Sequence, residues 1–365
     1  MRIAMISPLI ESVPPRLYGG TERVIHNLAR GLEAAGHEIT LFASGDSMTA
    51  GRLVSVVPEA FRLSQKPIAD PIAYNFRMMA LVAAQAQRFD VIHNHHDYWM
   101  LPLSEMTDTP VLTTLHGRLD LPDIPAAFMS FPKARFISIS DSQRGPLALL
   151  PWAATIHHGL DLQDFRFNPN PGKYLAFLGR IFPDKGPHRA IQIARAAGIP
   201  LKIAAKIEGP ESQAYFDTEI KPYVDGTSVE FIGEISEHEK SGFLGNALGT
   251  LFPIDWPEPF GLVMIESLAC GTPVLARPCG AAPEVLRDGV TGWSSMNVSH
   301  LAKRALDLET IDRPRCRQWV EENFSLQRMT EAYIDVYRNL SDARIHGSTS
   351  RHRRDFLHPV ERTAL

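Results

Sequence analysis

The 365-residue sequence has few cysteines, no long apolar run and little net charge. Its three cysteines, Cys270, Cys279 and Cys316, lack the spacing of a metal site and are too few for a disulfide framework, which favours a reducing compartment. No apolar stretch approaches the roughly 20 residues that span a bilayer. A formal net charge of −4 gives no general attraction to nucleic acid. We therefore expect a cytoplasmic protein that binds no nucleic acid.

Several motifs of nucleotide and metal chemistry are also absent. Neither the G-x-G-x-x-G fingerprint of dinucleotide-binding folds nor the G-x-x-x-x-G-K-[ST] P-loop occurs, and there is no Asp-x-Asp pair of the kind that holds a divalent ion in nucleotide-sugar enzymes. His93, His95 and His96 follow a predicted strand; His93 and His95 would point to the same side if the strand persisted, but no third ligand with motif spacing is evident for that pair. This favours polar residues lining a cleft over a zinc site. We expect no metal and no cofactor.

What the sequence does contain is a regular alternation of apolar, strand-like runs with helical patterns, which predicts parallel sheets flanked by helices. A turn-rich stretch at 167–172 with two prolines interrupts the series and is the best linker candidate. We therefore predict two α/β domains, 1–165 and 173–325. The expected strands are 2–7, 37–43, 90–93, 111–115 and 135–139 in the first domain, and 174–178, 201–205, 229–232, 250–252 and 274–276 in the second.

The end of the chain divides into two parts. Apolar residues recur at spacings of three and four over 326–340, from Met329 to Leu340, and predict an amphipathic helix. The segment 341–365 contains five arginines but little apolar periodicity, so we expect a mobile tail. Its arginines leave a peripheral contact with anionic lipid open, although its acidic residues dilute the charge.

The most informative segment is Glu258-Pro-Phe-Gly-Leu-Val-Met-Ile-Glu266, which places two carboxylates around the predicted start of a helix. Pro257 and Pro259 cannot continue the preceding strand, so Glu258 should lie in a loop beside the free amides of the first helical turn. Such amides can receive an anion, and ionised Glu is a strong acceptor for sugar hydroxyls. The segment is typical of a sugar-nucleotide pocket; alternatively, Glu258 caps the helix and Glu266 faces solvent.

Two further loops carry residue types that suit a diphosphate. Gly19 and Gly20 lie at a predicted strand-to-helix crossing, where glycine lets the backbone approach a ligand closely. Arg180 and Lys185 follow the first strand of the second domain, at the edge of an α/β sheet where ligands bind. Together the two cations could neutralise a diphosphate without a metal. The alternatives are a plain turn and two solvated cations. His116 ends another predicted strand and is the best single histidine candidate.

These segments, in this order, resemble the retaining family 4 glycosyltransferases over roughly residues 1 to 340. The motifs that carry the resemblance are Tyr18-Gly-Gly-Thr-Glu, Thr114-Leu-His116-Gly, His158-Gly-Leu-Asp161, Gly179-Arg180 with Lys185-Gly186, and the Glu258 to Glu266 segment, which continues through Cys270-Gly-Thr-Pro-Val and Gly280-Ala-Ala-Pro-Glu284. The resemblance implies a GT-B architecture, in which two Rossmann-like domains face each other across a cleft. It also implies that the helix within 326–340 crosses back onto the first domain.

The resemblance assigns a role to each candidate. Arg180 and Lys185 would contact the donor diphosphate, Glu266 the ribose, and His116 the transferred sugar. Glu258 would hold the donor sugar and phosphate together with the backbone amides around Phe260, Gly261, Leu262 and Val263, and Gly19 and Gly20 would approach the diphosphate from the first domain. Neither glutamate need be a nucleophile. One departure is the run 203–210, which replaces the Gly-x-Gly of many relatives and puts that loop's contacts in doubt.

The expected reaction is transfer of a hexose, with UDP-glucose favoured as donor and GDP-mannose next, to an acceptor that the sequence does not identify. We expect His95, Tyr98, Trp99 and Arg118 to line the route of that acceptor. Three other functions stay open: an inactive sugar-nucleotide-binding protein on the same fold, a sugar-nucleotide epimerase, and a nicotinamide-dependent oxidoreductase. The missing glycine fingerprint argues against the oxidoreductase, and the combined presence of the charged residues argues against an inactive protein.

Overall fold

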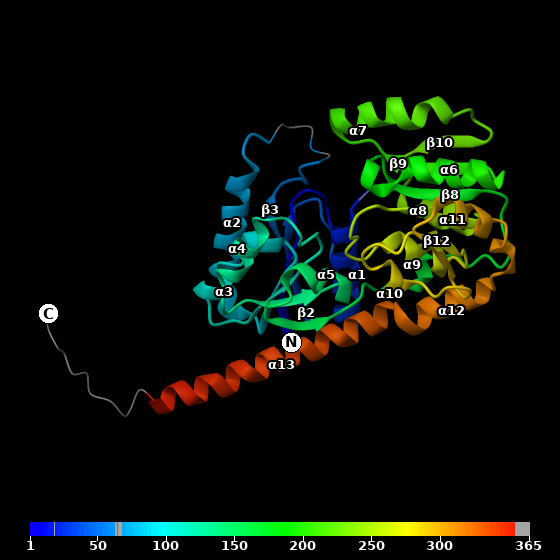
Figure 1. Cartoon of the computed structure of the whole chain (residues 1–365). Helices are drawn as coiled ribbons and strands as arrows, with labels where there is room; N and C mark the ends of the chain where they lie inside the picture. The colour runs from blue at the N-terminus through cyan, green and yellow to red at the C-terminus, as the bar shows by residue number, and fades with distance from the viewer. Residues whose placement is uncertain (18, 63, 65–67, 355–365) are drawn as a thin grey trace.

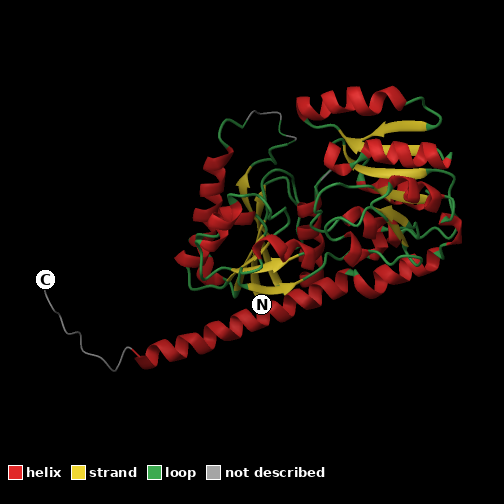
Figure 2. Cartoon of the chain, in the orientation of Figure 1, coloured by secondary structure: helices red, strands yellow, loops and turns green. Residues whose placement is uncertain are grey.

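Two parallel sheets, each covered by helices, organise the chain (Figures 1 and 2). The computed structural model describes residues 1–17, 19–62, 64 and 68–354, and gives only the backbone for 344–354. Tyr18 of the Gly-Gly motif therefore lies outside the described residues. The two sheets belong to separate α/β domains, as the alternating sequence pattern predicts.

The sheet of the first domain has seven strands in the order β3-β2-β1-β4-β5-β6-β7. Its strands are β1 (Arg2–Ile6), β2 (Glu38–Ser44), β3 (Arg52–Val57), β4 (Val91–Asn94), β5 (Val111–Thr114), β6 (Arg135–Ser138) and β7 (Trp152–Thr155). The helices are α1 (Gly20–Ala34), α2 (Pro71–Ala83), α3 (Leu103–Met106), α4 (Ile124–Met129) and α5 (Asp141–Arg144).

The second sheet has six strands in the order β10-β9-β8-β11-β12-β13. They are β8 (Leu175–Arg180), β9 (Leu201–Lys206), β10 (Val229–Gly233), β11 (Gly249–Phe252), β12 (Val274–Ala276) and β13 (Gly292–Ser294). The helices are α6 (Pro187–Ala197), α7 (Gly209–Tyr215), α8 (Glu237–Gly245), α9 (Leu262–Ala269), α10 (Ala282–Val285), α11 (Val298–Ala305) and α12 (Arg313–Asn323), followed by α13 (Leu326–Arg354).

Short helical turns complete the list of regular segments. The 3-10 turns are Ala86–Arg88, Asp97–Met100, Gly145–Leu147, Leu162–Asp164, Pro183–Lys185, Lys221–Tyr223 and Leu308–Thr310, and a π-helical turn spans Phe216–Ile220.

The central strands are buried on both faces, which explains their nearly continuous apolar sequences. In β1, Ile3 and Met5 pack into the core beneath α1 and α13, whereas Ala4 and Ile6 pack into the core on the opposite face of the sheet. This alternation follows from the two-residue period of a strand. The burial of one strand between two helical layers explains the alternating strand and helix pattern of the sequence.

All the strands predicted from the sequence are present, with ends shifted by a residue or two. Three further strands, β3, β7 and β13, were not predicted. Each lies at an edge of its sheet and is partly exposed, so its residues are less uniformly apolar than those of a central strand. The edge position therefore explains why the apolar pattern misses them.

Helix α13 follows α12, which lies beneath the second domain, and runs back beneath the first domain (Figure 1). It starts at the junction between the two domains, where the Leu326 amide donates to the carbonyl of Leu160. Its residues Met329, Tyr333 and Tyr337 then pack into the core of the first domain. The predicted return of the last helix to the first domain is therefore confirmed.

The same helix extends beyond its expected end. The segment 341–365 was expected to be a mobile tail, but it is helical as far as Arg354, and residues 355–365 lie outside the described residues. Adding residues to an already formed helix costs little free energy, because only nucleation is expensive. A helix anchored by its packed residues can therefore continue without an apolar stripe.

Candidate active site

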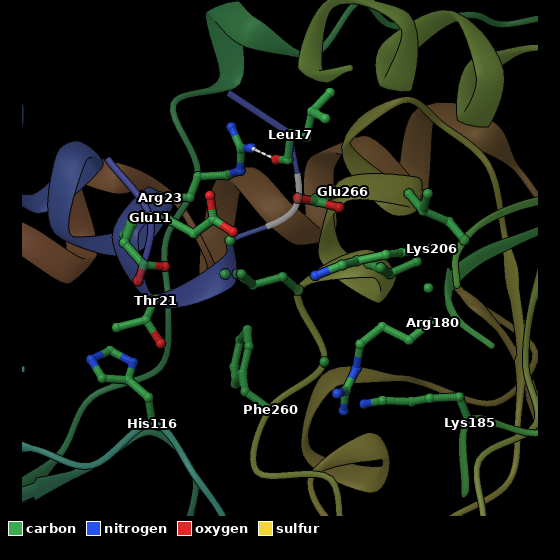
Figure 3. A pocket seen from close by; sticks show the side chains of 18 of the residues that line it. Glu11, Leu17, Thr21, Arg23, His116, Arg180, Lys185, Lys206, Phe260 and Glu266 are labelled. Atoms are coloured by element: carbon green, nitrogen blue, oxygen red, sulfur yellow. Dashed lines mark hydrogen bonds between the residues drawn. The ribbon is translucent and has the colours of Figure 1, made fainter. Parts of the chain in front are cut away.

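A cavity of about 530 Å³ lies between the two domains. The loops that follow β1, β5 and β6 line it from the first domain, and the loops that follow β8, β9 and β11 line it from the second. In Figure 3, Thr21, Arg23 and His116 lie on one side of the cavity, and Arg180, Lys185 and Lys206 lie on the other. Ligands of parallel α/β sheets bind at this carboxyl edge of the strands.

The loop between β11 and α9 carries Glu258 into this cavity. Gly261 ends the loop with a φ of 86°, and a Cβ atom there would lie 2.8 Å from Phe252 and Met264, so the position requires glycine. Helix α9 then begins at Leu262. We call residues 256–261 the donor loop. As predicted, the two glutamates stand on either side of the start of a helix.

Arg180 and Lys185 approach the donor loop from the end of β8 and the turn after it. Lys185 forms an ion pair with Glu258, and its Nζ atom lies 4.5 Å from the ring centroid of Trp256. The Arg180 guanidinium lies 5.3 Å from the ring of Phe182, and its buried Nε atom has no hydrogen-bond partner among the described residues. The two cations therefore face the same part of the cavity as the donor loop (Figure 3).

Glu266 projects from α9 into the cavity and is only 1% exposed. Its Oε1 atom lies 2.7 Å from Nζ of Lys240 on α8, whereas its buried Oε2 atom has no partner among the described residues. An ionised oxygen left unpaired in a protein interior is costly unless a ligand donates to it. This oxygen is suited to accept a hydrogen bond from a sugar hydroxyl.

The first domain contributes the start of α1 to the cavity. Gly19 and Gly20 line it, and the carboxyl of Glu22, 5% exposed, lies in the first turn of the helix. Burial raises the pKa of Glu22 to about 7, and its own backbone amide opposes this shift. The predicted glycine pair between β1 and α1 is thus next to Glu22, a carboxyl that is protonated more readily than usual.

Two ion pairs bridge the domains along the cavity. Arg23 on α1 lies 2.8 Å from Glu237 on α8, and Arg62 lies 3.6 Å from Glu234. Arg62 also pairs with the buried Glu11 of its own domain. These contacts hold the two walls of the cavity together through charged side chains.

His116 lines the cavity from the first domain and belongs to a group of four histidines. Its Nε2 atom lies 2.9 Å from Nδ1 of His95, and its ring stacks against His158 with a centroid distance of 5.4 Å. His95 in turn packs against His93, with 3.9 Å between ring centroids. Burial lowers the pKa of His116 to about 3 and holds the pKa values of the other three well below the ordinary range. All four rings are therefore neutral near pH 7.

The cavity brings together all the residues that the sequence assigned to the donor and to catalysis. They are Gly19, Gly20, His116, Arg180, Lys185, Glu258, Phe260, Gly261, Leu262, Val263 and Glu266. Because the first three come from one domain and the rest from the other, folding assembles the predicted set from both sides of the cleft.

Of the four residues expected along the acceptor route, one is buried and three are at least partly exposed, where an acceptor could reach them. His95 is 1% exposed and lies behind His116, so the expectation that it lines an open route is wrong. The sequence pattern alone could not reveal that β5 and its following loop cover it. Tyr98 is exposed and stacks on Trp99, and the Arg118 guanidinium lies 5.9 Å from the ring of Trp256. Contact of these three with an acceptor stays a prediction.

Several residues of the cavity were not predicted. Lys240 pairs with Glu266, Lys206 ends β9, and Glu22 and Arg23 belong to the first turn of α1. Lys206 lies 2.7 Å from Glu208, both within the run that departs from the usual Gly-x-Gly. Two sequence signals mark α8: the Ser236-x-x-Glu239 capping box at its start and the spacing of Glu237 and Lys240 on one face.

The described residues contain neither a metal site nor a membrane-spanning helix. Among the described residues, no three His, Cys, Asp or Glu side chains are grouped so as to hold a metal ion. No helix in the described ranges combines the length and the apolar character needed to cross a membrane.

Two protein-family models match consecutive parts of the chain. The model described as "Glycosyltransferase Family 4" matches residues 18–164, and the model described as "Glycosyl transferases group 1" matches residues 162–325. Their boundary coincides with the crossing between the domains.

Curated relatives match over most of the chain. A glycogen synthase of Mycobacterium tuberculosis is 26% identical, covering 92% of this chain and 94% of the relative. A phosphatidyl-myo-inositol mannosyltransferase of Propionibacterium freudenreichii is also 26% identical, covering 86% and 87%.

Solved structures share the two-domain fold. A sucrose-phosphate synthase from Thermosynechococcus elongatus has a TM-score of 0.76 at 20% identity, covering 94% of this chain and 99% of that one. An Anabaena protein in complex with UDP and glucose has a TM-score of 0.71 at 17% identity, covering 93% and 100%.

Proposed function

Because the chain belongs to the family 4 glycosyltransferases and has the GT-B fold, we propose that it moves a hexose from a nucleoside-diphosphate sugar to an acceptor hydroxyl, with retention of configuration and without a metal ion. The donor sugar nucleotide occupies the cavity between the domains. UDP-glucose is the favoured donor and GDP-mannose the next. The relatives support a hexose but differ in the sugar, since one is a glycogen synthase and another a mannosyltransferase.

The unpaired Oε2 atom of Glu266 is the observation that carries this proposal. A buried carboxylate oxygen that lines a cavity and has no partner among the described residues is suited to accept a hydrogen bond from a ligand. Lys240 holds the other oxygen through an ion pair. In the proposed complex, Glu266 accepts from the ribose hydroxyls of the nucleotide.

The diphosphate lies between Arg180, Lys185 and the amides at the start of α9. Departure of the diphosphate concentrates negative charge on its oxygens, so cations fixed at that point stabilise the transition state more than the ground state. Lys185 now pairs with Glu258. When the diphosphate takes over the ammonium group, the Glu258 carboxylate becomes free to accept from hydroxyls of the donor sugar.

His116 contacts the transferred sugar from the first domain. Its pKa of about 3 keeps the imidazole neutral, so it acts as a hydrogen-bonding group rather than as a cation. No protein carboxylate needs to attack the sugar in this scheme. The departing phosphate takes the proton of the acceptor hydroxyl on the same face of the sugar, which preserves the configuration.

The first test is thermal stabilisation by UDP-, GDP- and ADP-sugars and by NAD, compared between the wild type, Glu266→Ala and Arg180→Ala. We expect one sugar nucleotide to raise the melting temperature of the wild type and to do so much less in both variants. Stabilisation by NAD alone, or a shift that neither substitution reduces, would overturn the site assignment.

The nucleotide that binds then identifies the donor for an activity assay. Release of the nucleoside diphosphate that depends on an added acceptor, with an axial product linkage from an axial donor, is the expected result. Conversion of the donor into an epimer without acceptor would establish the epimerase instead. Binding without turnover against a broad acceptor panel would favour the inactive sugar-nucleotide-binding protein.

A further inference from the structure

Glu284, on α10 of the second domain, forms three hydrogen bonds to the first domain. Its Oε2 atom accepts from the Asp141 amide at 2.8 Å, and its Oε1 atom accepts from the Ser142 amide at 2.7 Å. The Nε2 atom of His157 lies 3.0 Å from Oε2. Burial opposes ionisation of this carboxyl, but the hydrogen bonds from His157, Ser142 and Asp141 outweigh it and lower the pKa of Glu284. The carboxylate is thus held by the first turn of α5, across the domain junction (Figure 1).

The contacts around α10 reach the donor loop on the other side. Gly280, just before α10, packs so tightly on Glu258 that a Cβ atom would lie 2.2 Å from the Glu258 carbonyl oxygen. The Ala281 amide donates to the same carbonyl at 2.9 Å. From the first domain, Ser140 donates its hydroxyl proton to the carbonyl of Pro259 at 2.6 Å. The donor loop is therefore held between the α10 segment and the residue that precedes α5.

Helix α5 also holds the loop that carries His116. The side-chain amide of Gln143 is buried and donates to the carbonyls of Leu115 at 2.9 Å and Gly117 at 2.8 Å, one on each side of His116. The Gln143 Oε1 atom accepts from the Ile139 amide at 2.9 Å. One short helix thus connects the Glu284 carboxylate to the backbone around His116.

From this chain of contacts we propose that Glu284 is a positioning residue, which fixes α5 against the second domain so that His116 and the donor loop face the same reacting sugar. Glu284 is not among the residues that line the cavity. Its effect passes through the Asp141 and Ser142 amides to Gln143, and from there to the His116 loop. The kinetic part of this proposal rests on the proposed function; the structural part does not.

The structural part is tested by amide hydrogen exchange on the protein without ligand. In Glu284→Ala we expect exchange to accelerate about tenfold or more in segments 140–144 and 115–117, because two amide hydrogen bonds that anchor α5 are lost. Gln143→Ala should accelerate 115–117 but leave the amides of Asp141 and Ser142 protected. Glu322→Gln, an exposed glutamate whose partners lie within α12, is the matched control and should change neither segment. Unchanged exchange at 115–117 in Glu284→Ala overturns the proposal.

Kinetic measurements distinguish a role of Glu284 in positioning from a role in donor binding. With the donor found above, Glu284→Ala should lower kcat about tenfold to a hundredfold, since misplacement of reacting groups by an ångström has effects of that size. The thermal shift produced by the donor should stay as in the wild type. Glu284→Gln keeps one acceptor oxygen, so its kcat should lie between those of the wild type and Glu284→Ala. A loss of donor affinity that accounts for the whole loss of kcat/KM overturns the positioning role.

The two proposals fail in different ways. A wild type without transfer activity contradicts the proposed function but leaves the exchange experiment decisive for Glu284. An active wild type with an unaltered kcat in Glu284→Ala contradicts only the positioning role. If Glu284→Ala does not fold, Glu284→Gln and Gln143→Ala supply the same comparison.

Discussion

The Nζ atom of Lys240 lies 2.7 Å from Oε1 of Glu266, and this ion pair joins two helices of the second domain inside the cavity. Lys240 also lies 3.0 Å from Glu237, one turn earlier on α8. The ammonium group therefore orients the Glu266 carboxylate, whose second oxygen has no partner in the part of the chain that the structure describes. The carboxylate is organised before any ligand arrives, which lowers the cost of binding.

The first prediction concerns the affinity for the nucleotide. Glu266→Gln should raise the Kd of the donor nucleotide about 10- to 100-fold, because a hydrogen bond to a charged group contributes roughly 1.5 to 3 kcal/mol. Isothermal titration calorimetry measures this change. Glu230→Gln removes an exposed carboxylate that pairs with Lys202 on the same domain and should leave Kd unchanged. An unaltered Kd in Glu266→Gln would contradict the ribose contact.

The second prediction concerns the leaving group. Lys185→Ala should lower kcat about 100- to 1,000-fold, the usual cost of removing one group that stabilises developing charge. The exposed Lys202→Ala serves as its control. Turnover by the wild type should be insensitive to EDTA, because Arg180 and Lys185 supply the positive charge at the diphosphate. Chelator-sensitive turnover that a divalent ion restores would defeat this prediction.

The third prediction concerns stability and pH. The pKa of Glu22 is raised from 4.5 to about 7, so the folded protein binds a proton there that the unfolded chain has lost between these pH values. Stability therefore falls as the pH rises from about 4.5 to 7, and above pH 7 the folded protein carries the full cost of the ionised carboxylate. Glu22→Gln should increase the free energy of unfolding at about pH 8 by up to roughly 3 kcal/mol and should change it little near pH 5. Urea unfolding at both pH values measures the difference.

The buried histidines provide an internal comparison for that experiment. Their lowered pKa values mean that the unfolded chain binds protons below about pH 6.5 that folded His93, His95 and His158 do not bind. Stability should therefore fall as the pH drops from 7 towards 5.5, by up to about 1.4 kcal/mol per pH unit for each histidine. Because Glu22 acts with the opposite sign, this dependence should be steeper in Glu22→Gln. An equal slope in the two proteins would show that Glu22 is ionised normally.

The fourth prediction concerns the attachment of α13. The Tyr337 hydroxyl lies 2.6 Å from Nδ1 of His93, and both side chains are fully buried. Tyr337→Phe leaves the histidine nitrogen without this partner and should lower the free energy of unfolding by about 1 to 3 kcal/mol. Tyr223→Phe, at an exposed position, should have almost no effect. Equal stabilities of the two variants in denaturant titrations would contradict the role of this hydrogen bond.

The parts of the structure that the sequence predicts are those that leave a local pattern. Central strands such as β1 and β11 are apolar because helices cover both faces, and the prolines around Glu258 mark a loop before a helix. The glutamates at 258 and 266 and the cations at 180 and 185 could be singled out because they flank the start of a predicted helix or follow a predicted strand, and the family resemblance supplied their roles. Because the strands of each sheet are parallel, their carboxyl ends and the loops that follow them lie at the same edge of the sheet.

The remaining features depend on contacts between distant segments. Nothing in the sequence around Lys240 indicates that it meets Glu266, and nothing around Glu284 indicates that it accepts amides from α5. His95 looked like a cleft residue because it follows a strand, but the neighbouring strand and its loop bury it. Such outcomes are set by how elements pack, which no short sequence window records.

The position of helix α13 in the chain affects the order in which the two domains can fold during translation. The core of the first domain contains Tyr333 and Tyr337, which are translated only after the whole second domain. During synthesis one apolar face of the first sheet therefore stays uncovered until α13 is translated. The second domain can fold before that, because the residues of its core come earlier in the chain. The first domain is completed only when the segment with Tyr333 and Tyr337 has left the ribosome, so a chain truncated before that segment has an incomplete first domain.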